Sequence, residues 1–177
     1  IVPPVKGQSI QKLYDNIDPL MEFKPPFIDV TTSREEYVYI DKGNGLLERK
    51  MTRMRPGTVG ICAALMHKYN VDPVPHVLCG GFTREETEYV LVDCHYLGID
   101  NVVALRGDSM KHESQFVPVK GGNNYAVDLV KQISQLNKGR FLVDTIDTPY
   151  TPDFCVGVAG YPEKHFEAPS LQSDLQR

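Results

Sequence analysis

The chain has 177 residues, of which 41% are hydrophobic and 24% charged, and these values fit one sizeable globular domain and exclude a disordered chain. A formal net charge of −4 and a pI near 5.7 give no reason to expect a nucleic acid or an anionic membrane as a partner. No apolar run approaches the roughly 20 residues of a membrane helix, and no basic stretch followed by an apolar one marks a signal peptide.

The first half of the chain alternates between helical and strand patterns. Apolar side chains recur at helical spacing from Gln8 to Glu22, and two prolines follow. Residues 27–32 are mostly β-formers and predict a strand. Residues 33–56 are charged and show neither period, so we expect a long excursion from the carboxyl end of that strand. A helix is predicted over 58–69.

Two strands and a helix are predicted next. Residues 74–79 read as a strand, and Thr83-Arg84-Glu85-Glu86 is a capping box, in which the Thr and the Glu each satisfy a free backbone N–H of the first turn. The helix that it opens runs to about Leu97, where Gly98 suits the stop. Residues 101–105 are a short apolar run that predicts a strand buried on both faces.

The remaining chain continues the alternation. A polar loop over 109–122 leads to a helix over 123–136. A second excursion, 137–153, contains two prolines and has room for a short extended piece at 140–145. Residues 154–159 predict a further strand.

This strand–helix alternation requires a parallel sheet with right-handed crossovers, either an open doubly wound sheet or part of a (β/α)8 TIM barrel. No strand is followed by G-x-G-x-x-G or G-x-x-x-x-G-K, which favours the barrel. A whole barrel needs roughly 250 residues. Ile1 to Pro4 reads as the end of a strand, and Ser170 to Arg177 as the opening of a helix. We therefore expect 1–177 to be one incomplete domain, truncated at both ends.

Four dispersed cysteines lack the paired spacing of metal ligands, and their apolar surroundings predict buried free thiols in a reducing, cytoplasmic compartment. They are Cys62, Cys79, Cys94 and Cys155. A zinc site could be imagined from His76, His165 and Asp108, but no helix supplies paired ligands, so we expect no metal.

Polar residues fall at or near the carboxyl ends of separate predicted strands, which is where barrel active sites form. They are Thr31, Thr32, His76, Arg106, Gly107, Asp108, Tyr161, Glu163 and His165. Singly, each has an ordinary interpretation: His76 as a core histidine, Thr31 as a strand residue, Arg106 to Asp108 as a surface turn. Together they indicate a cofactor enzyme, because Arg106 suits a phosphate and Asp108 suits a nitrogen-rich ring.

Three segments resemble the methylenetetrahydrofolate reductase family. They are Pro75-His76-Val77-Leu78-Cys79, Ala104-Leu105-Arg106-Gly107-Asp108 and Ala159-Gly160-Tyr161-Pro162-Glu163-x-His165 with Glu167-Ala168. The resemblance implies a (β/α)8 barrel that carries FAD. It also implies hydride transfer from NAD(P)H to the flavin and then to 5,10-methylenetetrahydrofolate, which forms 5-methyltetrahydrofolate. NADH and NADPH remain equally open.

The resemblance also implies roles for individual residues. Positions that match FAD contacts of the family are Thr31, His76, Leu105, Arg106, Gly107, Asp108, Tyr125, Ala126, Ala159, His165 and Asp174. Asp108 matches the aspartate that lies beside the flavin and holds the pterin ring, and Tyr161 matches a tyrosine near the flavin. The family's general acid would precede Ile1, and its later folate contacts would follow Arg177.

We therefore expect the full-length protein to be the reductase, forming a homo-oligomer, and the chain as given to be inactive alone. The excursions 33–56 and 137–153 exceed those of the bacterial enzymes, which leaves the donor site open. Two alternatives stay open: a non-catalytic flavin- or folate-binding fragment, and an interaction module that uses an exposed Arg106-Gly107-Asp108.

Overall fold

A four-stranded parallel sheet forms the centre of the computed structural model, in the strand order β1-β4-β5-β6. The structure describes residues 1–110, 113–143, 150–165 and 167–176. The strands are β1 (Phe27–Val30), β4 (Asp72–Leu78), β5 (Asn101–Leu105) and β6 (Cys155–Val158). Neighbouring strands follow one another along the chain, apart from an inserted hairpin, and the order never reverses.

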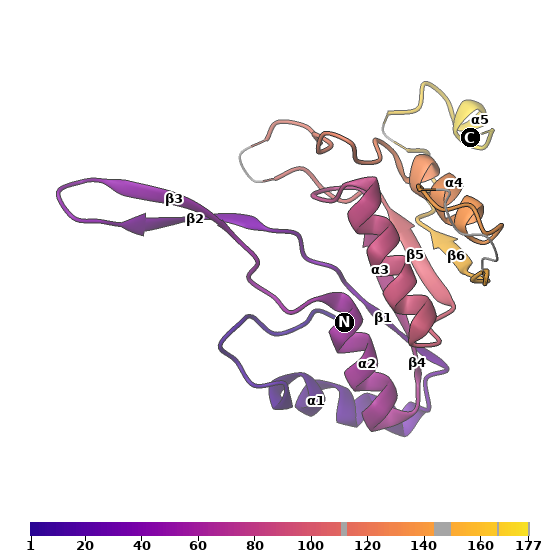
Figure 1. Ribbon diagram of the computed structural model, residues 1–177, viewed down its shortest axis with the longest axis horizontal. Coiled ribbons are helices and arrows are strands. Elements are labelled where there is room, and N and C mark those ends of the chain that lie inside the picture. The colour runs from indigo at the N-terminus through magenta and orange to yellow at the C-terminus, as the bar shows by residue number, and fades with distance from the viewer. Residues whose placement is uncertain (111–112, 144–149, 166, 177) are drawn as a thin grey trace.

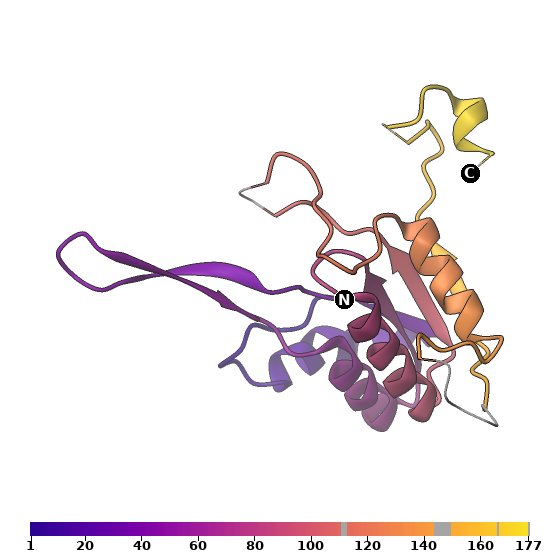
Figure 2. The same ribbon diagram turned by 45° about the horizontal axis from the view of Figure 1, so that its top comes forward.

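Three helices cover one face of this sheet (Figures 1 and 2). They are α2 (Thr58–Tyr69), α3 (Arg84–Tyr96) and α4 (Ala126–Leu136). Leu65, Leu91 and Ile133 are fully buried in one core with strand residues such as Val77 and Ala104. A doubly wound sheet has helices on both faces and a reversal of strand order. The one-sided layering and the sequential order are instead those of a (β/α)8 barrel wall, as predicted.

The opposite face of the sheet is the one that lines the inside of a barrel. Register pairs His76 with Val103 and Val103 with Gly157, so these three residues form one row across the sheet. Leu78 and Leu105 form the next row toward the carboxyl ends. Because successive side chains of a strand alternate between faces, this face holds the residues that point away from the helical core.

The N-terminal segment differs from the single helix expected over residues 8–22. An α-helix, α1 (Gln11–Ile17), passes into a 3-10 helix, η1 (Asp18–Phe23), with Pro19 at its start. Proline lacks the N–H that would continue the α-helical ladder, which explains the change. Ile1 exchanges backbone hydrogen bonds with Asp29 and Thr31 beside β1, although residues 1–4 are not assigned as a strand.

The segment 33–56 leaves the carboxyl end of β1 as a long excursion, as predicted, but it contains regular structure that the sequence pattern did not indicate. It forms an antiparallel hairpin, β2 (Glu36–Asp41) and β3 (Leu47–Thr52), that projects away from the sheet (Figure 1). Both faces of the hairpin are largely exposed. The sequence therefore lacks the apolar–polar alternation that marks a strand with one buried face.

The other predicted elements are confirmed to within a few residues. The capping box of α3 forms, with Glu86 accepting from the Thr83 N–H at 2.8 Å and Thr83 Oγ1 accepting from the Glu86 N–H at 3.1 Å. A short helix, α5 (Leu171–Asp174), follows Ser170. Residues 140–143 form no strand, and the rest of the expected extended piece at 140–145 lies outside the described residues.

The cysteine prediction is correct for three residues and wrong for one. Burial raises the pKa of the Cys62 and Cys94 thiols to about 12 and that of Cys79 to about 11. Cys155 is exposed, because it lies on β6 at the edge of the described sheet. None of the helices formed by the described residues has the length and apolar character needed to cross a bilayer.

Candidate functional site

The carboxyl ends of β1, β4 and β5 meet along one rim of the sheet. Pairing continues beyond the strands, since the Cys79 N–H donates to the Leu105 carbonyl and the Gly80 N–H to the Arg106 carbonyl, both at 3.0 Å. Gly107 follows with a φ of +83°, a backbone conformation that glycine adopts without strain. The chain turns there, and this turn brings Asp108 to the rim.

Asp108 lines a cleft of about 490 Å³ between the base of the hairpin and the loop after β5. One wall consists of Gly107, Asp108, Ser109 and Met110; the other includes Thr32 to Tyr37 and Tyr39. Arg34 joins the two walls. Its guanidinium donates to the backbone carbonyl of Asp108 at 2.7 Å and lies 3.8 Å from the carboxylate of Glu113.

His76 lines a second cleft of about 220 Å³, much of whose remaining lining comes from the helical layer, with Thr58 and Val59 of α2 and Thr87, Val90 and Asp93 of α3. Thr32, Ser33 and Leu78 line both clefts, so the two clefts adjoin where β1 and β4 end. His76 and Asp108 lie toward the same edge of the sheet, because the parallel strands β4 and β5 end there. The Thr32 hydroxyl donates to the His76 carbonyl and is 2.6 Å from the Thr58 hydroxyl. These contacts tie the end of β1 to β4 and to the start of α2.

Burial lowers the pKa of the His76 imidazole below its usual value of 6.5, and the Asp29 carboxylate opposes this shift in part. The His76 imidazole therefore takes up a proton more readily in the unfolded chain than in the folded one. The burial of neutral His76 contributes to stability above about pH 6.5, and this contribution is lost as the pH falls below that value. We expect His76→Gln to reduce the fall in melting temperature between about pH 7 and about pH 5. Thermal melts of the full-length protein and the variant measure this; parallel pH profiles would contradict it.

Arg106 is held by its neighbours. Its guanidinium lies 2.8 Å from the carboxylate of Glu167 and 5.3 Å from the centre of the Phe116 ring. The Arg106 side chain is 23% exposed. An adhesion motif needs an accessible arginine on a free loop, so these contacts disfavour the alternative of an interaction module built on Arg106-Gly107-Asp108.

Tyr125 and Ala126 lie at the start of α4, where Asp128 accepts a hydrogen bond from the Tyr125 N–H at 3.1 Å. Buried amides hold this helix to the neighbouring one. Asn123 donates to Gln132 at 2.7 Å, and Gln132 donates to the Arg84 carbonyl at 2.7 Å. Tyr125 and Ala126 line neither cleft.

The segment after β6 forms a separate cluster beyond the sheet (Figure 2). The rings of Tyr161 and His165 meet edge to face at 5.0 Å, and the His165 N–H donates to the carboxylate of Asp174. The Arg106–Glu167 ion pair connects this cluster to β5. The structure does not bring Ala159, Tyr161, His165 or Asp174 into either cleft.

Some groups of the rim fit a bound cofactor. Among the described residues, Oγ1 of Thr31 is buried and has no hydrogen-bond partner, although buried hydroxyls are ordinarily paired. Thr31 stands directly after β1, beside the row that contains His76. A ligand with a polar atom at this position would satisfy the hydroxyl. No group of three or more metal-ligating side chains occurs within the described ranges.

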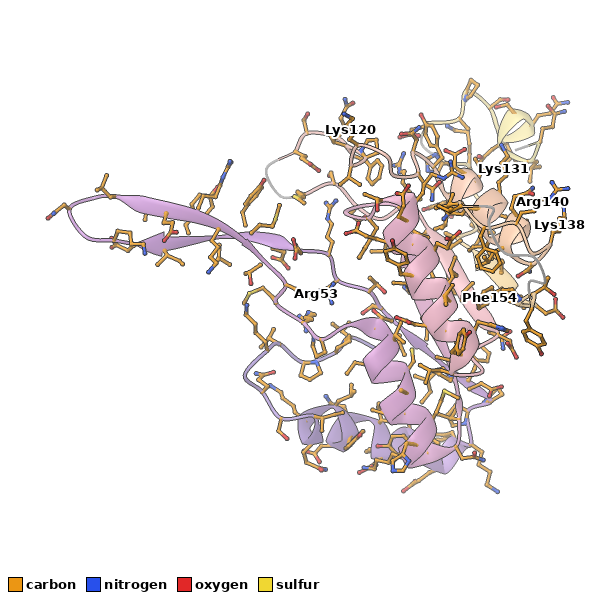
Figure 3. The ribbon with its side chains drawn as sticks, viewed as in Figure 1. Arg53, Lys120, Lys131, Lys138, Arg140 and Phe154 are labelled. Atoms are coloured by element: carbon orange, nitrogen blue, oxygen red, sulfur yellow. The ribbon has the colours of Figure 1, made fainter. Side chains whose placement is uncertain are left out.

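Sequence reasoning missed the residues that shape the first cleft, above all Arg34, Tyr37 and Tyr39. The position of Arg34 three residues after Thr31 was an available signal, because side chains at that end of a strand face the rim. Figure 3 places Lys131, Lys138 and Arg140 around α4, away from this rim, whereas Arg53 lies where the chain leaves the hairpin and lines the second cleft.

A parallel barrel wall with a cleft at its carboxyl rim is the arrangement in which βα-barrel enzymes form their active sites. The family profile of methylenetetrahydrofolate reductase matches residues 1–177. The chain belongs to the methylenetetrahydrofolate reductase family, whose named members are oxidoreductases.

Curated relatives match nearly the whole chain. Methylenetetrahydrofolate reductase 2 of Saccharomyces cerevisiae is 30% identical over 173 residues, covering 97% of this chain and 24% of the relative. Methylenetetrahydrofolate reductase 1 of Schizosaccharomyces pombe is 32% identical over 162 residues, covering 91% and 22%. The 5,10-methylenetetrahydrofolate reductase of Escherichia coli is 30% identical over 175 residues, covering 98% and 46%. The chain thus spans less than half the length of each of these relatives.

Proposed function

We propose that the whole protein, of which this chain spans a part, reduces 5,10-methylenetetrahydrofolate to 5-methyltetrahydrofolate with FAD as cofactor and NAD(P)H as donor. The observation that carries the proposal is the shared rim, where His76 and Asp108 line adjoining clefts in a chain of this family. When bound, FAD would accept a hydride from the donor and deliver it to the folate.

Different residues of the chain would bind different parts of the cofactor. Thr31, with its unpartnered hydroxyl, and His76, kept neutral by burial, would hold the cofactor along the inner face of the sheet. Leu105 and Gly107 would contact it at the end of β5, where Gly107 presents backbone without a side chain. Arg106 would bind a charged part of the cofactor, after exchanging or sharing its pairing with Glu167.

Asp108 would act on the substrate. Its carboxylate accepts hydrogen bonds from ring N–H groups, and the pterin of the folate presents such groups. The position of Asp108 does not depend on its own side chain, because Arg34 binds the backbone carbonyl. The proposed cofactor contacts that line neither cleft are Thr31, Leu105, Arg106, Tyr125, Ala126, Ala159, Tyr161, His165 and Asp174.

The first test is whether the purified full-length protein carries a flavin that turns over. We expect the yellow flavin absorbance, its anaerobic loss on addition of NADH or NADPH, and its return on addition of methylenetetrahydrofolate. Bound flavin that neither donor reduces would contradict the reductase and favour a non-catalytic binding protein. Running the two donors separately also determines which one the protein uses.

A sharper prediction concerns Thr31. We expect Thr31→Val to weaken flavin affinity about fivefold to tenfold, the effect of one lost hydrogen bond. The flavin-free variant should be at least as stable as the wild type, since the substitution removes a buried hydroxyl without a partner. Flavin titration and melting of the flavin-free protein measure the two effects. Thr151→Val, at an exposed threonine that lines neither cleft, serves as the matched control, and unchanged flavin affinity in Thr31→Val would refute the contact.

A further inference from the structure

We propose that the β2–β3 hairpin is a binding wall of the Asp108 cleft. The Tyr39 ring stacks on a planar ring of the ligand, and the Asp108 carboxylate accepts hydrogen bonds from the N–H groups of that ring. This inference rests on the proposed function and adds to it a second, aromatic side of the substrate site. The ring chemistry has two sources in that reaction, the pterin of the folate and the rings of the nicotinamide donor.

The first observation is that the cleft has two walls from distant parts of the sequence. Tyr37 and Tyr39 of β2 line one side, and Asp108 with the residues next to it lines the other. In Figure 1 the hairpin leaves the body at this rim and projects outward. A ligand that contacts Asp108 in this cleft therefore faces Tyr37 and Tyr39 across it.

The second observation is that the two walls are attached to each other. Arg34, at the base of the hairpin, donates to the Asp108 carbonyl at 2.7 Å, and its side chain is only 14% exposed. A Cβ added at Gly81 would lie 2.9 Å from Cβ of Arg34, and Gly81 has a φ of +82°. The glycine thus makes room for Arg34 against the loop after β4, and this packing sets the width of the cleft.

The third observation is the chemistry of the hairpin face. Tyr37 pairs with Met51 and Tyr39 with Arg49, so the four side chains share one face of the ribbon. The Arg49 guanidinium already lies over the Tyr37 ring, 4.5 Å from its centre. The Tyr39 side chain is 62% exposed, which leaves its ring open to a further planar group.

The charged side chains that line the cleft favour a ring with N–H groups over an anionic group. Glu35 and Glu36 line the cleft together with Asp108, while the cation of Arg34 is engaged by Asp108 and Glu113. Carboxylates disfavour phosphate groups and accept hydrogen bonds from N–H donors. The cleft therefore suits the heteroaromatic end of a ligand, with anionic groups of that ligand held outside it.

The test uses the full-length flavoprotein and three variants: Tyr39→Ala, Tyr39→Phe and Leu47→Ala. Leu47 lies on the same ribbon face, is 64% exposed and does not line the cleft, which makes it the matched control. We expect Tyr39→Ala to raise the KM of one substrate about tenfold, the usual effect of a lost stacking ring. The kcat, flavin content and melting temperature should stay unchanged, and Tyr39→Phe and Leu47→Ala should resemble the wild type.

The two half-reactions distinguish the two sources of the ring. A KM effect confined to flavin reduction assigns the stack to the donor, and one confined to flavin reoxidation assigns it to the folate. Both KM values within about twofold of wild type would overturn the inference. A wild-type protein without flavin turnover would instead overturn the proposed function.

In that case the stacking contact can still be tested by calorimetry. The affinities of wild type and of Tyr39→Ala for 5-methyltetrahydrofolate and for NADPH are compared, and equal affinities would refute the stacking contact.

Discussion

Replacing Asp108 with asparagine in the full-length protein is expected to slow reduction of the folate by the flavin about 100-fold. The carboxylate binds and polarises the folate in the proposed function, and a neutral amide of the same size loses that charge. Reduction of the flavin by the nicotinamide donor should change by less than about fivefold. Because Arg34 binds the backbone carbonyl of residue 108, the substitution leaves the loop in place. Stopped-flow absorbance of the flavin measures each half-reaction separately.

Asp100→Asn provides the matched control, since Asp100 precedes β5 at the opposite end of the same strand. That variant should retain both rates. An equal loss in the two half-reactions of Asp108→Asn would contradict the assigned role, because it would indicate a general disturbance of the flavin and not a contact to the folate.

The second large effect concerns stability. Leu91→Ala is expected to lower the free energy of unfolding by about 3 kcal/mol, the usual range for a fully buried leucine being 2–5 kcal/mol. Leu91 has 0% exposure and packs α3 into the core shared with β4 and β5. Leu46→Ala, at a residue that is 66% exposed in the turn of the hairpin, should change stability by less than about 0.5 kcal/mol.

Chemical denaturation of the full-length protein and both variants measures these differences, provided that one cooperative transition is observed. A loss below about 1 kcal/mol for Leu91→Ala would show that α3 does not support the sheet as the packing indicates.

Much of the fold was predictable because its signals are local. The Thr83–Glu86 capping box, the apolar run 101–105 and the helical spacing over 58–69 each depend on neighbours within a few residues. The hairpin was not predictable in the same way. It is held by cross-strand pairs such as Tyr39 with Arg49, and neither of its faces is buried enough to leave a period-2 pattern.

The candidate site, too, was predictable only in part. His76 and Asp108 were predicted to share a rim because parallel strands end at one edge, and the structure places them in adjoining clefts. Tyr161, His165 and Asp174 follow β6 in the chain, yet they gather in a separate cluster. Their distance from the clefts depends on the path of the chain after the strand, which no local pattern encodes.

By itself, the sequence determined the alternation of strands and helices, the barrel type of that alternation and the resemblance that names the family. Only the tertiary structure decided that Arg34 joins the hairpin to Asp108 and that Tyr39 faces the same cleft. The physical reason is the range of the interactions. Caps and periodicity act within one or two turns, whereas the contact between Arg34 and Asp108 spans 74 positions and exists only once the sheet has aligned its strand ends.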